Sequence, residues 1–386
     1  MRRAKRWVAV FMLMSLVLTG CSTGLEDFYK DVKPADIAKK EEPAKEEKLE
    51  QTTKKKVAET AVVEQEEEED EEEIPEGMVK SYLTGEFVPE EQGRRRPVAI
   101  MLNNIVDACP QYGISRAGVV YEAPVEGQIT RLMGIFEQYD DLDKIGSVRS
   151  CREYYIFFAT EFNALYAHYG QAAYAVPYLE QDFVHNLSGL SQFGSDIYYR
   201  TSDRKAPHNA YTSYEGIQKG IADYGYSQEY DASYDGHYQF AKVGEMIELQ
   251  DENGATPANL VKLDCFNHNK PWFEYDASTG KYKRFQFGDI QIDEMTGEQL
   301  TFDNILIQYT SYKPYDKNGY LNLDVIYGGE GKYITHGKAI DVRWEKDAPW
   351  GRTHYITKQN QEITMNTGKT FVAIVLDDTV DQLTIQ

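Results

Sequence analysis

The chain has 386 residues and a net charge of −22 at pH 7, from 41 basic and 63 acidic side chains. An acidic body lacks the basic face that a phosphate backbone requires, so the composition argues against nucleic acid as a partner. The four cysteines show no CxxC or histidine-paired zinc spacing, and the chain has no GxGxxG, Walker, HExxH or GxSxG motif. We therefore expect no metal and no cofactor, and nucleotide enzymes, zinc proteases and α/β-hydrolases are disfavoured.

The N-terminal segment is typical of an exported protein. A basic stretch precedes an apolar run, Trp7 to Leu18, which is too short to span a bilayer comfortably. Leu18-Thr19-Gly20-Cys21 follows and resembles the bacterial lipobox, in which the signal is cut before a cysteine that carries lipid. Residues 1–21 are thus predicted to be a lipoprotein signal peptide ending at the lipidated Cys21, with the protein on the outer face of the cell membrane. The alternative is an ordinary secretory signal cleaved near Gly20.

The next segment, residues 22–96, is dominated by lysine and glutamate and includes the acidic block Glu64 to Glu73. Such a segment cannot bury enough apolar surface to offset the entropy of ordering, so we predict a disordered charged spacer. A spacer would hold the folded body away from the lipid. Binding of calcium or of a partner by the acidic block is the alternative.

The folded body is predicted to begin with a mixed α/β part, residues 97–236. Apolar or alternating runs predict strands at 97–104, 118–122, 131–139 and 164–168. Ser150 and Glu153 have the spacing of a capping box and predict a helix that continues through Phe158. A second helix is expected over 171–181. Thr212 and Glu215 form another capping box before a third helix.

Residues 237–386 consist of short segments rich in Tyr, Phe, Val, Ile and Thr, separated by turn sequences such as Asp316-Lys317-Asn318-Gly319. This rhythm predicts an antiparallel sheet or partial barrel. The fold class is therefore expected to be α+β, in which a layered N-terminal part of mixed sheet and helix is followed by a strand-rich antiparallel C-terminal part.

Charged side chains lie among apolar neighbours between Tyr121 and Tyr155. Buried charge is costly unless it is paired, so such a group indicates either a structural ion-pair network or a binding site. Arg149 and Arg152 flank the predicted helix start, where guanidinium groups and backbone N–H groups together favour an anion. The candidate ligand-binding residues are Arg149, Arg152, Arg131, Glu122, Glu126, Glu153, Tyr154, Tyr155, His168, Arg204 and His208.

Several long motifs, in this order, resemble the YerB lipoprotein family. They are RPVAIMLNN, GVVYEAPVEGQITRLMGIF, IGSVRSCREYY, ALYAHYGQ and RKAPHNAYTS in the first part, and GEGKYITHGKAIDVRWEKDAPWGRTHYI and NTGKTFVAIV in the second. The resemblance covers roughly residues 95–376 and implies an extracytoplasmic lipoprotein of Gram-positive bacteria with stacked sheet and helix layers. It implies no activity, because the family is functionally uncharacterised. Cys109 and Cys151 depart from the family pattern and are given no family role.

Three classes of function remain open. The first is a binding or accessory module that recognises anionic cell-envelope material, such as glycan or stem-peptide carboxylates, through Arg, Glu and Tyr side chains. The second is an envelope hydrolase that uses Glu126 and His208 as catalytic groups. In a straight strand Glu122 and Glu126 would lie about 13 Å apart, beyond the roughly 5–9.5 Å of glycosidase carboxylates. The third is a scaffold for envelope proteins.

Overall fold

The computed structural model describes residues 72–250 and 254–386. Within these ranges, no helix is long and apolar enough to cross a membrane. The predicted signal peptide, residues 1–21 with Cys21, lies outside the described residues, as does the predicted spacer up to residue 71.

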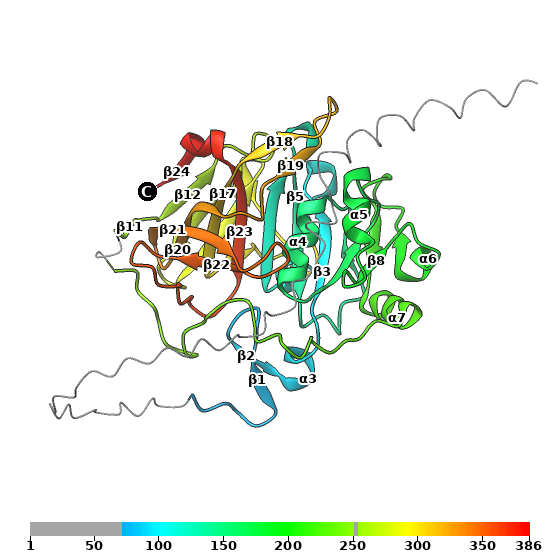
Figure 1. Ribbon diagram of the computed structural model, residues 1–386, viewed down its shortest axis with the longest axis horizontal. Coiled ribbons are helices and arrows are strands. Elements are labelled where there is room, and N and C mark those ends of the chain that lie inside the picture. Colours follow the sequence, from blue (N-terminus) through cyan, green and yellow to red (C-terminus); the bar gives the residue numbers. More distant parts are fainter. Residues whose placement is uncertain (1–71, 251–253) are drawn as a thin grey trace, which may run out of the picture. The chain divides into compact units, whose positions relative to one another are not determined.

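In the described part of the chain, an eleven-stranded mixed sheet runs through both the N-terminal and the C-terminal parts (Figure 1). Its spatial order is β11 (Thr256–Pro257), β21 (Lys338–Lys346), β20 (Gly329–Thr335), β17 (Asn304–Thr310), β23 (Thr370–Leu376), β4 (Val119–Pro124), β5 (Thr130–Phe136), β3 (Val98–Asn103), β7 (Leu165–His168) and β8 (Asn186–Ser188), and β22 (Thr353–Ile356) pairs with β21. The two parts meet where β23 and β4 pair in parallel, with Thr370 opposite Val119. Both strands are almost wholly buried, which explains their apolar sequences TFVAIVL and VVYEAP. The sheet is therefore continuous across the expected boundary between 97–236 and 237–386.

A six-stranded antiparallel sheet packs on one face of the large sheet. It contains β12 (Leu260–Leu263), β13 (Trp272–Asp276), β14 (Lys281–Gln286), β15 (Asp289–Ile290), β16 (Thr301–Phe302) and β24 (Leu383–Ile385). Phe273 of this sheet meets Phe371 of the large one, with ring centroids 4.9 Å apart. Burial alternates along β14, so Tyr282, Arg284 and Gln286 all point inward. This strand therefore brings two polar side chains into the interior.

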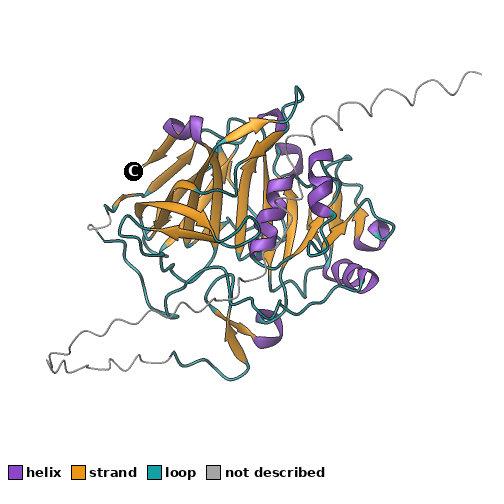
Figure 2. Ribbon diagram, in the orientation of Figure 1, coloured by secondary structure: helices purple, strands orange, loops and turns teal. Residues whose placement is uncertain are grey.

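Helices gather over the half of the large sheet that holds β3, β5 and β8 (Figure 2). They are α4 (Glu153–Glu161), α5 (Val176–Leu179), α6 (Gly194–Ile197) and α7 (Tyr214–Tyr224). α4 is buried nearly all round, and its Phe158 stacks on Tyr121 of β4 at 4.7 Å. The remaining short elements are β6 (Ile145–Gly146), β9 (Tyr198–Arg200), β10 (Ala210–Thr212), β18 (Tyr312–Pro314), β19 (Leu321–Leu323), and the 3-10 turns η1 (Val106–Ala108), η2 (Ile114–Arg116), η3 (Glu126–Gln128), η4 (Ala173–Ala175) and η6 (Asp377–Gln382). The α+β class, with a strand-rich second part, is confirmed.

The predicted strands of the first part are confirmed as β3, β4, β5 and β7, but the helix starts differ from the prediction. α4 begins at Glu153 with Arg152 as its N-cap, and Ser150 instead donates its hydroxyl to the carbonyl of Tyr169 at 3.2 Å. The N-cap of α7 is Ser213, which accepts a bond from the backbone of Gly216 at 3.1 Å. Over 171–181 the chain forms only the short η4 and α5.

The predicted end of the spacer at residue 96 is wrong. Residues before it form β1 (Met78–Lys80), β2 (Phe87–Pro89) and α3 (Glu90–Gly93). Leu83, between β1 and β2, and Val88, within β2, are buried. Ser81 donates a hydrogen bond to the carboxylate of Glu137 in the loop after β5, which ties this segment to the rest of the fold. A few apolar residues are enough to dock this segment, although the average composition of 22–96 is dominated by charge.

Candidate functional site

The candidate residues gather at one edge of the large sheet because of strand direction. β3, β4, β7 and β23 all run the same way, whereas β5 runs against β3 and β4. The carboxyl ends of β3, β4 and β7 and the start of β5 therefore lie at a common edge. In open sheets with parallel strands, ligands bind outside the carboxyl ends of the strands.

Three arginines and one glutamate form the arginine cluster, which we define as Glu126, Arg131, Arg149 and Arg152. Arg152 makes two hydrogen bonds to the carboxylate of Glu126. Its Nε donates to Oε2 at 2.8 Å, and its Nη2 donates to Oε1. Arg131 places Nη2 3.8 Å from the same Oε1 and donates Nη1 to the carbonyl of Ser150 at 2.5 Å. Arg149 donates to the carbonyl of Pro207 at 3.3 Å. The prediction that these side chains meet is correct.

The charges of the arginine cluster do not balance. Burial lowers the pKa of Arg131 to about 10, and the charge of Arg152 acts in the same direction. Burial and Arg152 also lower the pKa of Arg149. Burial alone would raise the pKa of Glu126, but the hydrogen bonds and charges of Arg152 and Arg131 outweigh it and hold that pKa below its ordinary value. Three guanidinium groups thus share one carboxylate, so the cluster favours an additional anion.

The arginine cluster is mostly buried but partly exposed at Glu126 and Arg149. The side chains of Arg131 and Arg152 are 5% and 6% exposed, whereas that of Glu126 is 26% exposed. Arg149 is half-buried. A fully buried cluster could serve only the fold, whereas the partial exposure of Glu126 and Arg149 allows a ligand to contact these two side chains.

The second part of the chain contributes aromatic residues to the same site. The β18–β19 hairpin carries Tyr320, whose ring centroid lies 5.3 Å from the guanidinium carbon of Arg152. It also carries Tyr315, which stacks on Tyr174 at 4.1 Å and hydrogen-bonds to Glu153. Glu153 is buried, and burial raises the pKa of its carboxyl to about 7. Sequence reasoning missed both hairpin tyrosines; the only signal was their place on either side of the turn at 316–319.

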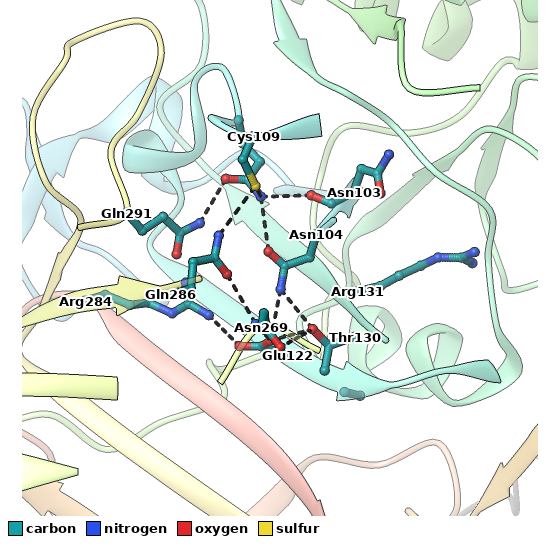
Figure 3. Close-up of polar contacts among 12 residues, drawn as sticks. Asn103, Asn104, Cys109, Glu122, Thr130, Arg131, Asn269, Arg284, Gln286 and Gln291 are labelled. Carbon is teal, nitrogen blue, oxygen red and sulfur yellow. Dashed lines mark hydrogen bonds and ion pairs between the residues drawn. The ribbon is translucent and has the colours of Figure 1, made fainter. Parts of the chain in front are cut away.

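Glu122 does not belong to the arginine cluster, contrary to the prediction. Figure 3 shows Arg131 directed away from Glu122, which is fully buried among polar side chains. Asn104, Thr130 and Asn269 donate to Oε1 of Glu122 at 2.9, 2.5 and 2.7 Å, and Arg284 of β14 donates to Oε2 at 2.5 Å. Arg284 is itself 1% exposed. This interior ion pair joins the two sheets, and Arg284 was not among the predicted residues.

Four other predicted ligand contacts serve the fold. Tyr154 and Tyr155 are buried, and their hydroxyls donate to the carbonyls of Pro124 and Arg131, at 2.7 and 2.6 Å. His168 is also buried, with one ring nitrogen 2.8 Å from the carbonyl of Gly170, and burial lowers its pKa. Arg204 lies elsewhere and pairs with Glu294 at 2.7 Å. Each of these four side chains therefore has a partner within the fold, and its contact with a ligand stays a prediction.

His208 lies next to the arginine cluster. One of its ring nitrogens is 2.9 Å from the side-chain amide nitrogen of Asn103, and its pKa is lowered by burial and by the charge of Arg149. In the part of the chain that the structure describes, no hydrogen bond joins His208 to Glu126. Nor do residues 72–250 and 254–386 contain a group of three or more His, Cys, Asp or Glu side chains that could hold a metal. The geometry therefore assembles a cationic, partly open edge rather than a proton-transfer pair.

Comparisons with known proteins place both parts of the chain in one family. The N-terminal domain of a protein of unknown function, DUF3048, matches residues 83–227, and the C-terminal domain of the same family matches residues 261–372. The chain is 31% identical over 302 residues to the Bacillus subtilis (strain 168) protein described as "Putative lipoprotein YerB", over 78% of this chain and 87% of the relative. A crystal structure of the YerB protein from Bacillus subtilis matches with a TM-score of 0.70 and 30% identity, over 80% of this chain and 99% of that one. The chain therefore belongs to the YerB family, whose function is not known.

Proposed function

We propose that this protein is an extracytoplasmic lipoprotein, anchored to the outer face of the cell membrane through Cys21, whose arginine cluster binds anionic cell-envelope material. Two observations support the anchor. The sequence around Cys21 has the form of a lipobox, and the word lipoprotein stands in the description of the Bacillus subtilis relative. The ligand is proposed from the charges of the arginine cluster.

The observation that carries the binding proposal is a local reversal of charge. The chain as a whole has a net charge of −22, yet the arginine cluster holds three cations against one carboxylate. Arg131 and Arg152 are held by Glu126 and by backbone carbonyls. The side chain of Arg149 makes one hydrogen bond among the described residues, to the carbonyl of Pro207. A guanidinium has five N–H donors, so most of those on Arg149 are available to a ligand.

A carboxylate is the anion that fits this arrangement best. The planar guanidinium matches a carboxylate with two parallel hydrogen bonds, and such charge-assisted bonds are stronger than neutral ones. The neighbouring hairpin tyrosines, Tyr315 and Tyr320, offer aromatic rings of the kind that pack on sugars or on peptide side chains. A membrane-anchored protein facing the wall meets both carboxylates and sugars in peptidoglycan, which makes stem-peptide or glycan carboxylates the proposed ligand.

Co-sedimentation with purified peptidoglycan tests this function. The full-length chain carrying Cys21→Ser, which prevents lipidation, is incubated with wall fragments and the retained fraction is measured. Arg149→Gln is expected to weaken retention by about tenfold, since it removes charge-assisted hydrogen bonds. Arg343→Gln is the matched control, because Arg343 lies on β21 in an exposed ion pair with Glu345. Equal retention of the parent and Arg149→Gln would discard the proposal.

The alternatives predict different results. A hydrolase using Glu126 and His208 would release new wall fragments, detectable by mass spectrometry. The two oxygens of Glu126 are engaged by Arg152, and its pKa is held low, which suits an anchor for arginine better than a proton donor. If wall material is not retained and cross-linking in cells captures only proteins, the scaffold function replaces the binding function.

A further inference from the structure

A further arginine, Arg200, lies next to the arginine cluster. It is the last residue of β9, which pairs with β10, and the loop before β10 contains Pro207 and Asn209. Arg149 donates to the carbonyl of Pro207 at 3.3 Å, and Nη1 of Arg200 donates to Oδ1 of Asn209 at 2.8 Å. The side chains of Arg149 and Arg200, which we call the arginine pair, therefore bind the same loop at positions two residues apart.

Tyr169, directly after β7, contacts both members of the arginine pair. Its backbone N–H donates to the carbonyl of Arg149 at 3.0 Å, and the guanidinium carbon of Arg200 lies 4.7 Å from the centre of its ring. Burial lowers the pKa of Arg149, and the charges of Arg152 and Arg200 lower it further. Two guanidinium groups of like charge are thus held near each other by contacts with uncharged groups.

Both members of the arginine pair present hydrogen-bond donors to solvent. Arg200 is exposed and makes one hydrogen bond among the described residues, so most of its five N–H donors are unused. Arg149 is half-buried, but the nitrogens that its bond to Pro207 leaves over are not among the buried, unpaired polar atoms of residues 72–250 and 254–386. These nitrogens therefore reach solvent, and a dissolved ligand can contact donors of both arginines.

The carboxylates near the arginine pair leave an excess of positive charge. Glu126 accepts two hydrogen bonds from Arg152. Asp107 is exposed and lies near His208, where its charge opposes the lowering of that pKa by burial and by Arg149. Among the described residues, neither carboxylate forms an ion pair with the arginine pair. The three arginines of the cluster and the one on β9 thus face two carboxylates, which leaves two positive charges for a ligand.

We propose that the arginine pair binds a ligand with two carboxylates, one held by Arg149 and the other by Arg200, as in a peptide that carries an acidic residue at or next to its C-terminus. The inference rests on the proposed function, which also uses Arg149, and it specifies the ligand as a dicarboxylate. Each guanidinium can hold one carboxylate with two parallel hydrogen bonds. A single carboxylate would leave one of the two positive charges uncompensated.

Two pairs of N-acetylated dipeptides test the inference. Acetyl-Ala-Glu and acetyl-Glu-Ala carry two carboxylates, on one residue or on neighbouring residues, and acetyl-Ala-Gln and acetyl-Gln-Ala are their counterparts with one. Binding to the full-length chain carrying Cys21→Ser is measured by calorimetry near pH 6.5, where the peptide carboxylates are ionised, in about 150 mM salt, which screens distant charges. At least one Glu peptide is expected to bind about fivefold to tenfold more tightly than its Gln counterpart, the effect of a second charge-assisted contact.

Three variants show which arginine causes the preference. Arg200→Gln should bind both members of each pair equally, whereas Arg149→Gln should weaken the binding of all four peptides. Arg94→Gln is the matched control, because Arg94 is also exposed and its guanidinium carbon also lies over a tyrosine ring, 4.6 Å from the centre of Tyr82. This control should keep the preference of the parent chain.

The outcomes separate this inference from the proposed function. Equal binding of Glu and Gln peptides by the parent chain, or a preference that survives Arg200→Gln, overturns the inference alone. The same holds if no peptide binds although wall material is retained through Arg149. If wall material is not retained either, both the proposed function and the inference are discarded.

Discussion

The interior ion pair between Glu122 and Arg284 provides the sharpest test of the fold. In Arg284→Met, the long apolar side chain keeps most of the volume, but the cation disappears. Asn104, Thr130 and Asn269 still donate to Oε1 of Glu122, whereas Oε2 has Arg284 as its hydrogen-bond donor. The substitution therefore leaves one oxygen of a fully buried carboxylate without a hydrogen-bond donor from the described part of the chain. Breaking a buried pair from one side costs about 3–5 kcal/mol, and the three remaining donors favour the lower end of that range.

Urea unfolding followed by circular dichroism and tryptophan fluorescence measures this cost. The double variant Glu122→Gln with Arg284→Met removes both charges and keeps an amide oxygen for the three donors, so it should recover to within about 1–2 kcal/mol of the parent. Arg343→Met, in an exposed pair with Glu345, should change stability by no more than about 0.5 kcal/mol. The reasoning is refuted if Arg284→Met costs less than about 1 kcal/mol, or if the double variant is no more stable than the single one.

Two further predictions follow from local contacts. Ser213→Ala should destabilise the protein by about 1 kcal/mol because it removes the N-cap hydrogen bond to Gly216. Ser150→Ala should destabilise it less, because Ser150 caps no helix. Urea unfolding measures the stability of both variants, and equal losses would contradict this prediction. Burial raises the pKa of Glu153 to about 7, from 4.5 in the unfolded chain. The neutral carboxyl therefore contributes stability that is fully present below pH 4.5 and is lost as the pH rises through 7. Glu153→Gln should therefore unfold at a higher temperature than the parent at pH 8 but not at pH 4, and a pH-independent difference would refute the assignment.

Local sequence features were enough to predict that Glu126 and the arginines meet. The predicted strands 118–122 and 131–139 lie on either side of Glu126, and Glu126 lies only 26 residues from Arg152. Charges set among apolar neighbours indicated that these residues would be paired. The capping boxes were less reliable, because Ser150 has the right spacing but not the N-cap position. Spacing alone does not fix that backbone geometry.

Long-range partners could not be predicted in this way. Arg284 lies 162 residues from Glu122, and the sequence KYKRFQ of β14 has polar residues on both faces, so alternation does not reveal which face is buried. Tyr320 reaches Arg152, and Tyr315 reaches Tyr174 and Glu153, only because a hairpin of the second part extends over the first. Grouping Glu122 with the arginines was wrong for the same reason: its true partner comes from another sheet.

The parallel pairing of β23 with β4 makes the two family domains depend on each other. On one side Val119 pairs with Ile135 of β5, but its neighbour on the other side, Thr370, is synthesised only about 250 residues later. A truncated polypeptide that stops before β23 would leave β4 as an apolar, unpaired edge, and such edges recruit other chains into aggregates. The two halves thus form one folding unit that neither could complete alone, and exchanging either half between relatives would require the opposite strand to be exchanged with it.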